Sequence, residues 1–204
     1  MGHPTSIRGP VAWLPHMDPG TLARMFKKIV LGILGVLVLA IAGFSAYVAT
    51  RPTHYTVTRS ELITATPETL APYLTDLRQW ILWNPWDELE PTSIKEYSDP
   101  ASGVGAWYTW SGEEVGSGRM EITAITPTRV DYALHFTAPM DDRAVVYMEL
   151  APEGEGRTRV TWTIEGELSF MGRAMDAVVG MDSMLGADFE RGLAKLERLL
   201  SSAH

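Results

Sequence analysis

Cysteine is absent from the 204-residue sequence, and histidine is scarce, with five residues in all. Without cysteine the chain has no disulfide bonds, no thiolate nucleophile and no cysteine-ligated metal. His135 is the only histidine well inside the region that we expect to fold, and a lone histidine on an outward face is typical of a surface residue. P-loop, GxSxG and GxGxxG motifs are also missing, so we expect neither a metal nor a cofactor.

Basic residues are few in the larger part of the chain. From Pro52 onward, 12 Lys and Arg stand against 24 Asp and Glu, which gives this part a net charge of −12. Nucleic acid and anionic lipid surfaces attract basic proteins and repel a domain of this charge. We therefore expect no nucleic-acid partner.

The longest apolar stretch runs from Ile29 to Val48, twenty residues without a charge. A helix of this length covers about 30 Å, the thickness of the hydrocarbon layer of a bilayer. A buried helix of a soluble domain is usually shorter, and a cleavable signal peptide has a shorter apolar region that ends in a small-residue cut site. The sequence therefore predicts an uncleaved transmembrane signal anchor over residues 25–50, after a disordered tail over residues 1–24.

The charges that flank this stretch predict its orientation. Arg24, Lys27 and Lys28 precede it, and only Arg51 follows closely. The positive-inside rule then keeps the N-terminus in the cytoplasm and exports residues 51–204, into the periplasm if the membrane is a bacterial inner membrane. We expect a single-pass membrane protein with an extracytoplasmic C-terminal domain.

Residues 51–204 are enough for one folded domain. Residues 55–65 are rich in Thr, Val and Ile and predict a strand, and residues 66–77 and 77–86 predict two short helices. Five more strands separated by short turns are predicted over residues 106–110, 118–125, 129–136, 143–150 and 158–165. A long C-terminal helix is indicated by the spacing of Leu185, Phe189, Leu193, Leu196 and Leu200. The fold class is therefore α+β, with a curved antiparallel sheet wrapped around the last helix.

Alternation along the strands separates an apolar face from a polar one. The expected inner face consists of Tyr108, Trp110, Met120, Ile122, Tyr132, Leu134, Phe136, Val146, Met148, Leu150, Val160, Trp162 and Ile164. On these strands the inner face carries no Asp, Glu, His, Lys or Arg, so its polar groups are phenols and indoles. General acid–base and nucleophilic catalysis need a titratable group near the substrate, so the pattern argues against an enzyme and predicts no catalytic residue.

Tryptophan and methionine are unusually dense around this face. Methionines and three glycines in the predicted last helix, Gly180, Gly186 and Gly192, indicate close packing, a helix break or room for a ligand. A solid core of Met and Trp is the alternative to a cavity. If a cavity exists, we expect its lining to include Tyr108, Trp110, Met120, Tyr132, Phe136, Met148, Trp162, Met181 and Met184.

Several longer segments carry a family resemblance. Residues 80–91 (WILWNPWDELEP), 102–122 and 157–175, together with the ending DFERGLAKLERLL, resemble a membrane-anchored member of the polyketide cyclase/dehydrase group in the START-like (SRPBCC) superfamily. The resemblance covers about residues 26–200 and implies a helix-grip fold. It leaves the activity open, because the superfamily includes lipid carriers, hormone receptors and aromatase/cyclases.

We therefore expect the domain to bind a hydrophobic small molecule or lipid in an apolar cavity, tethered to the membrane by the stretch from Ile29 to Val48. One alternative is a cyclase/dehydrase-type enzyme on a polyketide-like substrate, in which Tyr108, Tyr132 or an ordered water moves protons. Another is a chaperone-like partner of a membrane complex, with an exposed segment around Trp80, Trp83 and Trp86 as its contact. The oligomeric state is left open.

Overall fold

A computed structural model describes residues 19–202, which divide into two compact units, one ending at Tyr47 and one running from Val48. The described part of the first unit belongs to one helix, α1 (Pro19–Ala49), whose last two residues fall in the second unit. The stretch Leu22–Ala49 is long and apolar enough to cross a membrane, and its large apolar side chains before Val48 are exposed. Residues 1–18 of the expected tail lie outside the described residues, and residues 19–24 belong to α1 instead of the tail.

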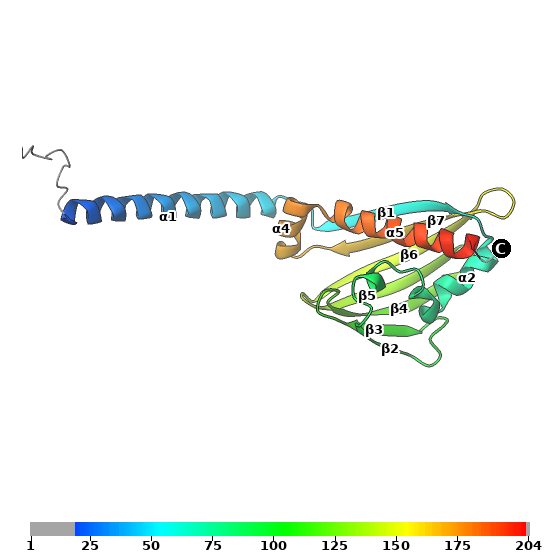
Figure 1. Ribbon diagram of the computed structural model, residues 1–204. Helices are drawn as coiled ribbons and strands as arrows, with labels where there is room; N and C mark the ends of the chain where they lie inside the picture. The colour runs from blue at the N-terminus through cyan, green and yellow to red at the C-terminus, as the bar shows by residue number, and fades with distance from the viewer. Residues whose placement is uncertain (1–18, 203–204) are drawn as a thin grey trace, which may run out of the picture. The chain divides into compact units, whose positions relative to one another are not determined.

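The second unit is built on one seven-stranded sheet in the order β1-β7-β6-β5-β4-β3-β2, and every neighbouring pair is antiparallel (Figure 1). The strands are β1 (His54–Ile63), β2 (Ile94–Tyr97), β3 (Trp107–Ser111), β4 (Ser117–Thr126), β5 (Arg129–Ala138), β6 (Asp142–Pro152) and β7 (Thr158–Glu167). Six of the seven match the prediction. The sequence did not predict β2, because it has four residues and its alternation of Ile94, Lys95, Glu96 and Tyr97 carries little apolar signal.

Two short helices and a 3-10 turn, η1 (Trp86–Glu88), connect β1 to β2. α2 (Pro67–Thr75) begins where the Thr66 hydroxyl accepts a hydrogen bond from the Thr69 N–H and Pro67 takes the first helical position. α3 (Leu77–Trp80) is shorter than the predicted helix over residues 77–86. The chain leaves the helix because Asn84 precedes a proline, and its side chain accepts from the N–H groups of Trp86 and Asp87 at 2.9 and 3.1 Å.

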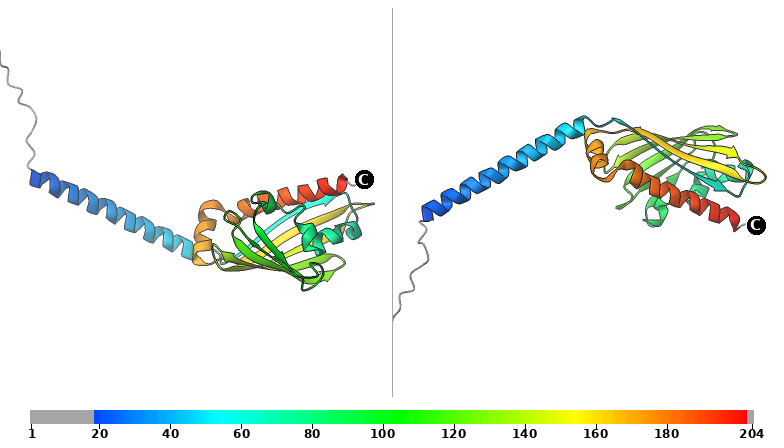
Figure 2. Two further views of the ribbon diagram at one scale, coloured as in Figure 1. Left: turned by 60° about the horizontal axis from the view of Figure 1, so that its bottom comes forward. Right: turned by 90° about the horizontal axis from the view of Figure 1, so that it is seen from above.

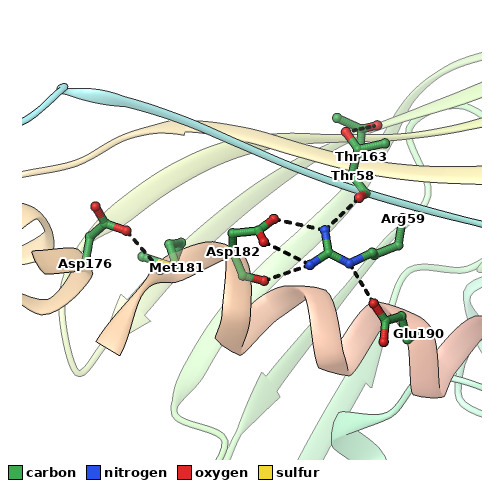
Figure 3. Close-up of polar contacts among 7 residues, drawn as sticks. All are labelled: Thr58, Arg59, Thr163, Asp176, Met181, Asp182 and Glu190. Carbon is green, nitrogen blue, oxygen red and sulfur yellow. Dashed lines mark hydrogen bonds and ion pairs between the residues drawn. The ribbon is translucent and has the colours of Figure 1, made fainter. Parts of the chain in front are cut away.

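The C-terminal helical sequence is broken at Gly180 into α4 (Phe170–Val179) and α5 (Met181–Ser201). Gly180 has a φ of +81°, a backbone conformation that glycine adopts without strain. The Asp176 carboxylate accepts a hydrogen bond of 2.9 Å from the Met181 N–H and so helps to start α5 (Figure 3). The break was one of the possibilities that the glycine spacing raised.

The α5 helix lies along the concave face of the sheet (Figures 1 and 2). Its Phe189 ring stacks on Trp162 with centroids 4.0 Å apart, and a Cβ at Gly192 would lie 2.9 Å from the same indole. The sheet residues expected on the inner face are all buried or half-buried, which confirms the phase of the strands. The arrangement is the expected α+β helix-grip fold.

A cluster of polar bonds fixes the start of α5 to β1. The Arg59 guanidinium donates to both carboxylate oxygens of Asp182, at 2.9 and 3.0 Å, and to Glu190 at 2.8 Å (Figure 3). A Cβ at Gly186 would clash with this guanidinium, so the glycine leaves room for the arginine.

Candidate functional site

The concave face of the sheet holds a cavity of about 330 Å³, within the usual range for small-molecule sites. Three tryptophans form much of its wall. Trp80 and Trp86 meet Trp162 edge to face, with ring centroids 5.3 and 5.8 Å apart. The other apolar lining residues include Met120, Leu134, Phe136, Val146, Ile164, Leu168, Met175, Met181, Met184, Leu185 and Phe189. The cavity is therefore a mainly apolar site with aromatic walls.

The cavity occupies one half of the concave face. On β4, β5 and β6 the residues Met120, Leu134 and Val146 line it. The next inward residue toward the opposite end of the sheet, Ile122, Tyr132 or Met148, does not. The remaining half is filled from above by α2 and α3, whose Leu70, Leu74 and Leu77 side chains are buried there.

The cavity opens at the end of the sheet where β1 begins. His54, the first residue of β1, pairs with Glu167 at the end of β7, and Phe136 near the end of β5 pairs with Asp142 at the start of β6. The antiparallel register therefore places the β5–β6 turn at this end, and Ala138, Pro139, Met140, Asp141 and Asp142 all line the cavity. Exposure of Met140, Met175 and Met184 shows that the lining reaches the surface here.

Seven of the nine residues expected in a cavity lining do line this one, namely Tyr108, Trp110, Met120, Phe136, Trp162, Met181 and Met184. Tyr132 and Met148 were expected in the lining but lie outside the cavity, because both side chains are fully buried in the half of the face that α2 and α3 fill. The Tyr132 hydroxyl donates a 2.6 Å hydrogen bond to the carbonyl of Leu74, which holds its ring under α2.

A charged pair at the cavity wall was missed by the sequence analysis. Lys95 lies opposite Trp110 in the β2–β3 register, forms an ion pair with Asp87 and donates a 2.8 Å hydrogen bond to the Ser93 hydroxyl. Both charged side chains are largely buried and line the cavity. We expected no charged side chain on the inner face of the predicted strands. The charged Lys95 lies on β2, a strand that was not predicted.

The polar groups of the aromatic wall differ in their hydrogen bonding. The Trp80 indole donates to the Tyr108 hydroxyl at 3.2 Å, and the Trp86 indole donates to Asp188 at 2.9 Å. The Trp162 indole N–H is buried and has no hydrogen-bond partner among residues 19–202. It is therefore a buried donor without a partner, of a kind that is rare in folded proteins.

Burial determines the protonation of the tyrosines in this region. It raises the pKa of Tyr108 and of Tyr132 far above the ordinary phenol value, and it is the main cause that raises the pKa of Tyr55, another lining residue, to about 12. All three therefore keep their protons at neutral pH and can donate hydrogen bonds but cannot serve as bases. Within the described part of the chain, no three His, Asp or Glu side chains lie together as a metal site.

The tryptophan segment proposed as an exposed contact is mostly internal. Trp80 and Trp83 are buried, and Trp86 is half-buried against Trp162 and Phe189. The segment therefore forms a cavity wall and does not offer an exposed aromatic surface.

Comparison with known proteins agrees with the helix-grip architecture. The chain belongs to the polyketide cyclase/dehydrase and lipid transport family, whose model matches residues 54–201. No curated protein matches the chain.

Solved structures with the same fold come from several bacteria. The protein MLL2253 of Mesorhizobium loti has 22% identity and a TM-score of 0.50, with 71% of this chain and 98% of that chain covered. SA2116 of Staphylococcus aureus, described as a protein of unknown function, has 11% identity, a TM-score of 0.54 and coverage of 74% and 95%. XoxI of Bacillus cereus has 13% identity, a TM-score of 0.51 and coverage of 73% and 98%. At these identities the likeness shows the fold alone, and the family's fold supports a ligand-binding role.

Proposed function

We propose that this domain binds a hydrophobic small molecule or the apolar part of a lipid. The observation that carries the proposal is the cavity of about 330 Å³ walled by Trp80, Trp86 and Trp162. Apolar walls with a few directed polar groups are typical of small-molecule sites. Here the Lys95–Asp87 pair in the cavity wall supplies such groups, which suits a ligand with one polar end.

A cyclase-type reaction is less well supported by the same geometry. Such a reaction needs a group that gains or loses a proton near neutral pH. Tyr108 keeps its proton, and Tyr132 lies outside the cavity with its hydroxyl bonded to Leu74. The two tyrosines considered for proton transfer therefore do not supply this group, and binding without chemical change is the function that we propose.

The proposal places the cavity close to a membrane. The α1 helix supplies the anchor, and four residues separate its end at Ala49 from the start of β1 at His54. An extended chain of this length reaches less than about 20 Å. The flanking Arg24, Lys27 and Lys28 favour a cytoplasmic N-terminus and hence a domain outside the cytoplasm.

The test uses the full chain in phosphatidylcholine vesicles and N-phenyl-1-naphthylamine, an apolar fluorescent probe. The probe should bind the parent protein, and energy transfer from the tryptophans should report its arrival. Leu134→Trp fills the cavity from β5 and should abolish binding, whereas Val145→Trp adds the same bulk on the outer face of β6 and should leave binding unchanged.

Native mass spectrometry of the detergent-solubilised parent adds a search for a lipid that co-purifies with it. A parent that binds no probe and carries no lipid would refute the proposal. Equal binding by the parent and Leu134→Trp would also refute it, because the probe would then occupy another place.

A further inference from the structure

The α4 helix has an exposed apolar surface that its own domain does not cover. Phe170, Met171, Met175, Val178 and Val179 are between 45% and 74% exposed, and Gly172 is the one buried residue of the ten in this helix. Helical periodicity places these five large apolar side chains on one side of α4, and an exposed apolar patch usually marks an interaction site.

Hydrogen bonds hold α4 beside the last residue of the candidate membrane span and the residues that follow it. Arg173 donates to the carbonyl of Ala49 at 3.3 Å, and Arg51 donates to the Asp176 carboxylate at 2.8 Å. At the end of β7, the Leu168 N–H donates to the carbonyl of Thr53 at 2.6 Å, just before α4 begins. If α1 spans the bilayer, the residues around its C-terminal end lie at the bilayer surface. The apolar patch on α4 is hydrogen-bonded to these residues and therefore lies near that surface.

The charges of α4 do not oppose contact with lipid. Its ten residues contain one basic and one acidic side chain, Arg173 and Asp176. Hydrogen bonds from the Met181 N–H and from Arg51 hold the pKa of Asp176 below its usual range, so this carboxylate is charged and paired. The helix itself therefore has no net charge, unlike the strongly acidic domain that carries it.

The same helix forms part of the cavity lining. Ser169 at its N-cap, Gly172 and Met175 all line the cavity, near its opening at the β5–β6 turn. A ligand that enters past Met175 therefore passes the patch that carries Val178 and Val179.

We propose that the apolar face of α4 lies in the lipid surface next to the anchor and that the cavity exchanges its ligand directly with the bilayer there. The exchange rests on the proposed function, whereas the contact of α4 with lipid does not. The occupant of the patch is therefore the membrane and not a second copy of the chain.

The first experiment measures where α4 lies, in the full chain reconstituted in phosphatidylcholine vesicles. Because the protein has no cysteine, Val178→Cys gives a single site for the fluorophore NBD. Val104→Cys is the matched control, a 63% exposed valine in the β2–β3 connection at the opposite end of the sheet. Spin-labelled lipids should quench NBD at residue 178 and leave NBD at residue 104 bright.

Equal quenching at the two sites would overturn the contact with lipid. A buried but unquenched label at residue 178, with energy transfer between labelled copies, would mean that a second copy covers the patch and would also overturn it.

The second experiment measures exchange. The double variant Val178→Glu with Val179→Glu should take up N-phenyl-1-naphthylamine from the bilayer about tenfold more slowly, because two charged side chains disfavour burial of this face in lipid. Its equilibrium binding should match that of the parent, and Val104→Glu should change neither quantity. An unchanged uptake rate in the double variant would overturn direct exchange.

The two proposals fail in different ways. Quenching at residue 178 in a protein that binds no probe would refute the cavity function and the exchange with it, and would leave the lipid contact of α4 standing. Probe binding without quenching would refute the lipid contact and leave the cavity function standing.

Discussion

The two halves of the concave face have the same alternating sequence pattern, but one half is filled with side chains and the other holds a cavity. Along β5, for example, Tyr132 and Leu134 are successive inward residues, yet the first is packed under α2 and the second lines a cavity. The difference lies in what covers the strands: α2 and α3 insert leucines over one half, while the other half faces the aromatic wall, α4 and the start of α5. A strand's alternation thus determines which side chains point inward, and the covering helices determine whether space remains.

The largest expected effect is a difference in unfolding free energy between a truncation in the filled half and one in the cavity half. Leu74→Ala should lower the free energy of unfolding by about 2–5 kcal/mol, because it opens a cavity in a filled region. Leu134→Ala should cost about 1 kcal/mol, because its side chain is half-buried beside space that already exists. Urea denaturation of the full chain in a non-ionic detergent checks both values, and equal losses would contradict the distinction between the halves.

A smaller contrast concerns the two buried phenols. Tyr132→Phe leaves the Leu74 carbonyl without its 2.6 Å hydrogen bond in a region without space, and should cost about 1–2 kcal/mol. Tyr108→Phe frees the Trp80 indole N–H at the cavity wall, where a water can replace the hydroxyl, so the expected loss is below about 1 kcal/mol. The same denaturation experiment compares the two, and a greater loss for Tyr108→Phe would show that the cavity half is the better packed.

Acid should loosen the cavity half first. The Glu90 carboxylate accepts hydrogen bonds from the N–H groups of Glu113, Glu114 and Val115 in the β3–β4 turn, and these bonds hold its pKa below the usual range. The stabilisation is complete above the ordinary glutamate pKa and is lost as the pH falls through the lowered pKa of the folded state. Amide exchange of residues 113–115 should accelerate, relative to the α2 amides, as the pH falls through that range.

The control for this experiment is the Glu90→Gln variant. Its amide hydrogens at residues 113–115 should exchange rapidly, and acid should not accelerate this exchange further. Loss of protection at α2 before the β3–β4 turn would contradict the expected order.

The smallest effect is expected at the surface cluster around Arg59. Arg59→Gln removes its bonds to Asp182 and Glu190 at a partly exposed site, and should cost less than about 1 kcal/mol. The cost should shrink further in high salt, because salt screens exposed ion pairs. Thermal unfolding of both proteins at low and high ionic strength checks this, and a loss that does not depend on salt would indicate packing against Gly186 instead of charge.

Most of the sheet was predictable because inward and outward residues alternate along β4 to β7 and because residues 55–65, which cover most of β1, are rich in Thr, Val and Ile. The missed strand, β2, is too short for alternation to be informative, and its omission also hid Lys95. Local signals at Thr66 and Pro67 located the start of α2, whereas the early end of α3 depends on the cap that Asn84 provides to the following turn.

The sequence predicted an apolar cavity, but it predicted only some of the residues that line it. Residues such as Trp162 and Met120 could be assigned to it because the alternation points them inward. The exclusion of Tyr132 and Met148 could not be foreseen, because it depends on where α2 packs across strands far away in sequence. The rim residue Met140 lay in a turn, where periodicity carries no information.

The break at Gly180 allows α4 and α5 to differ in local stability. The α4 helix buries only Gly172, whereas α5 buries six residues, among them Phe189, Leu193 and Leu196. Local unfolding costs little where few contacts are lost, so α4 can open and re-form many times during the lifetime of the folded domain while α5 stays in place. The part of the cavity rim that α4 lines can therefore open in a small, local equilibrium that is separate from the stability of the fold.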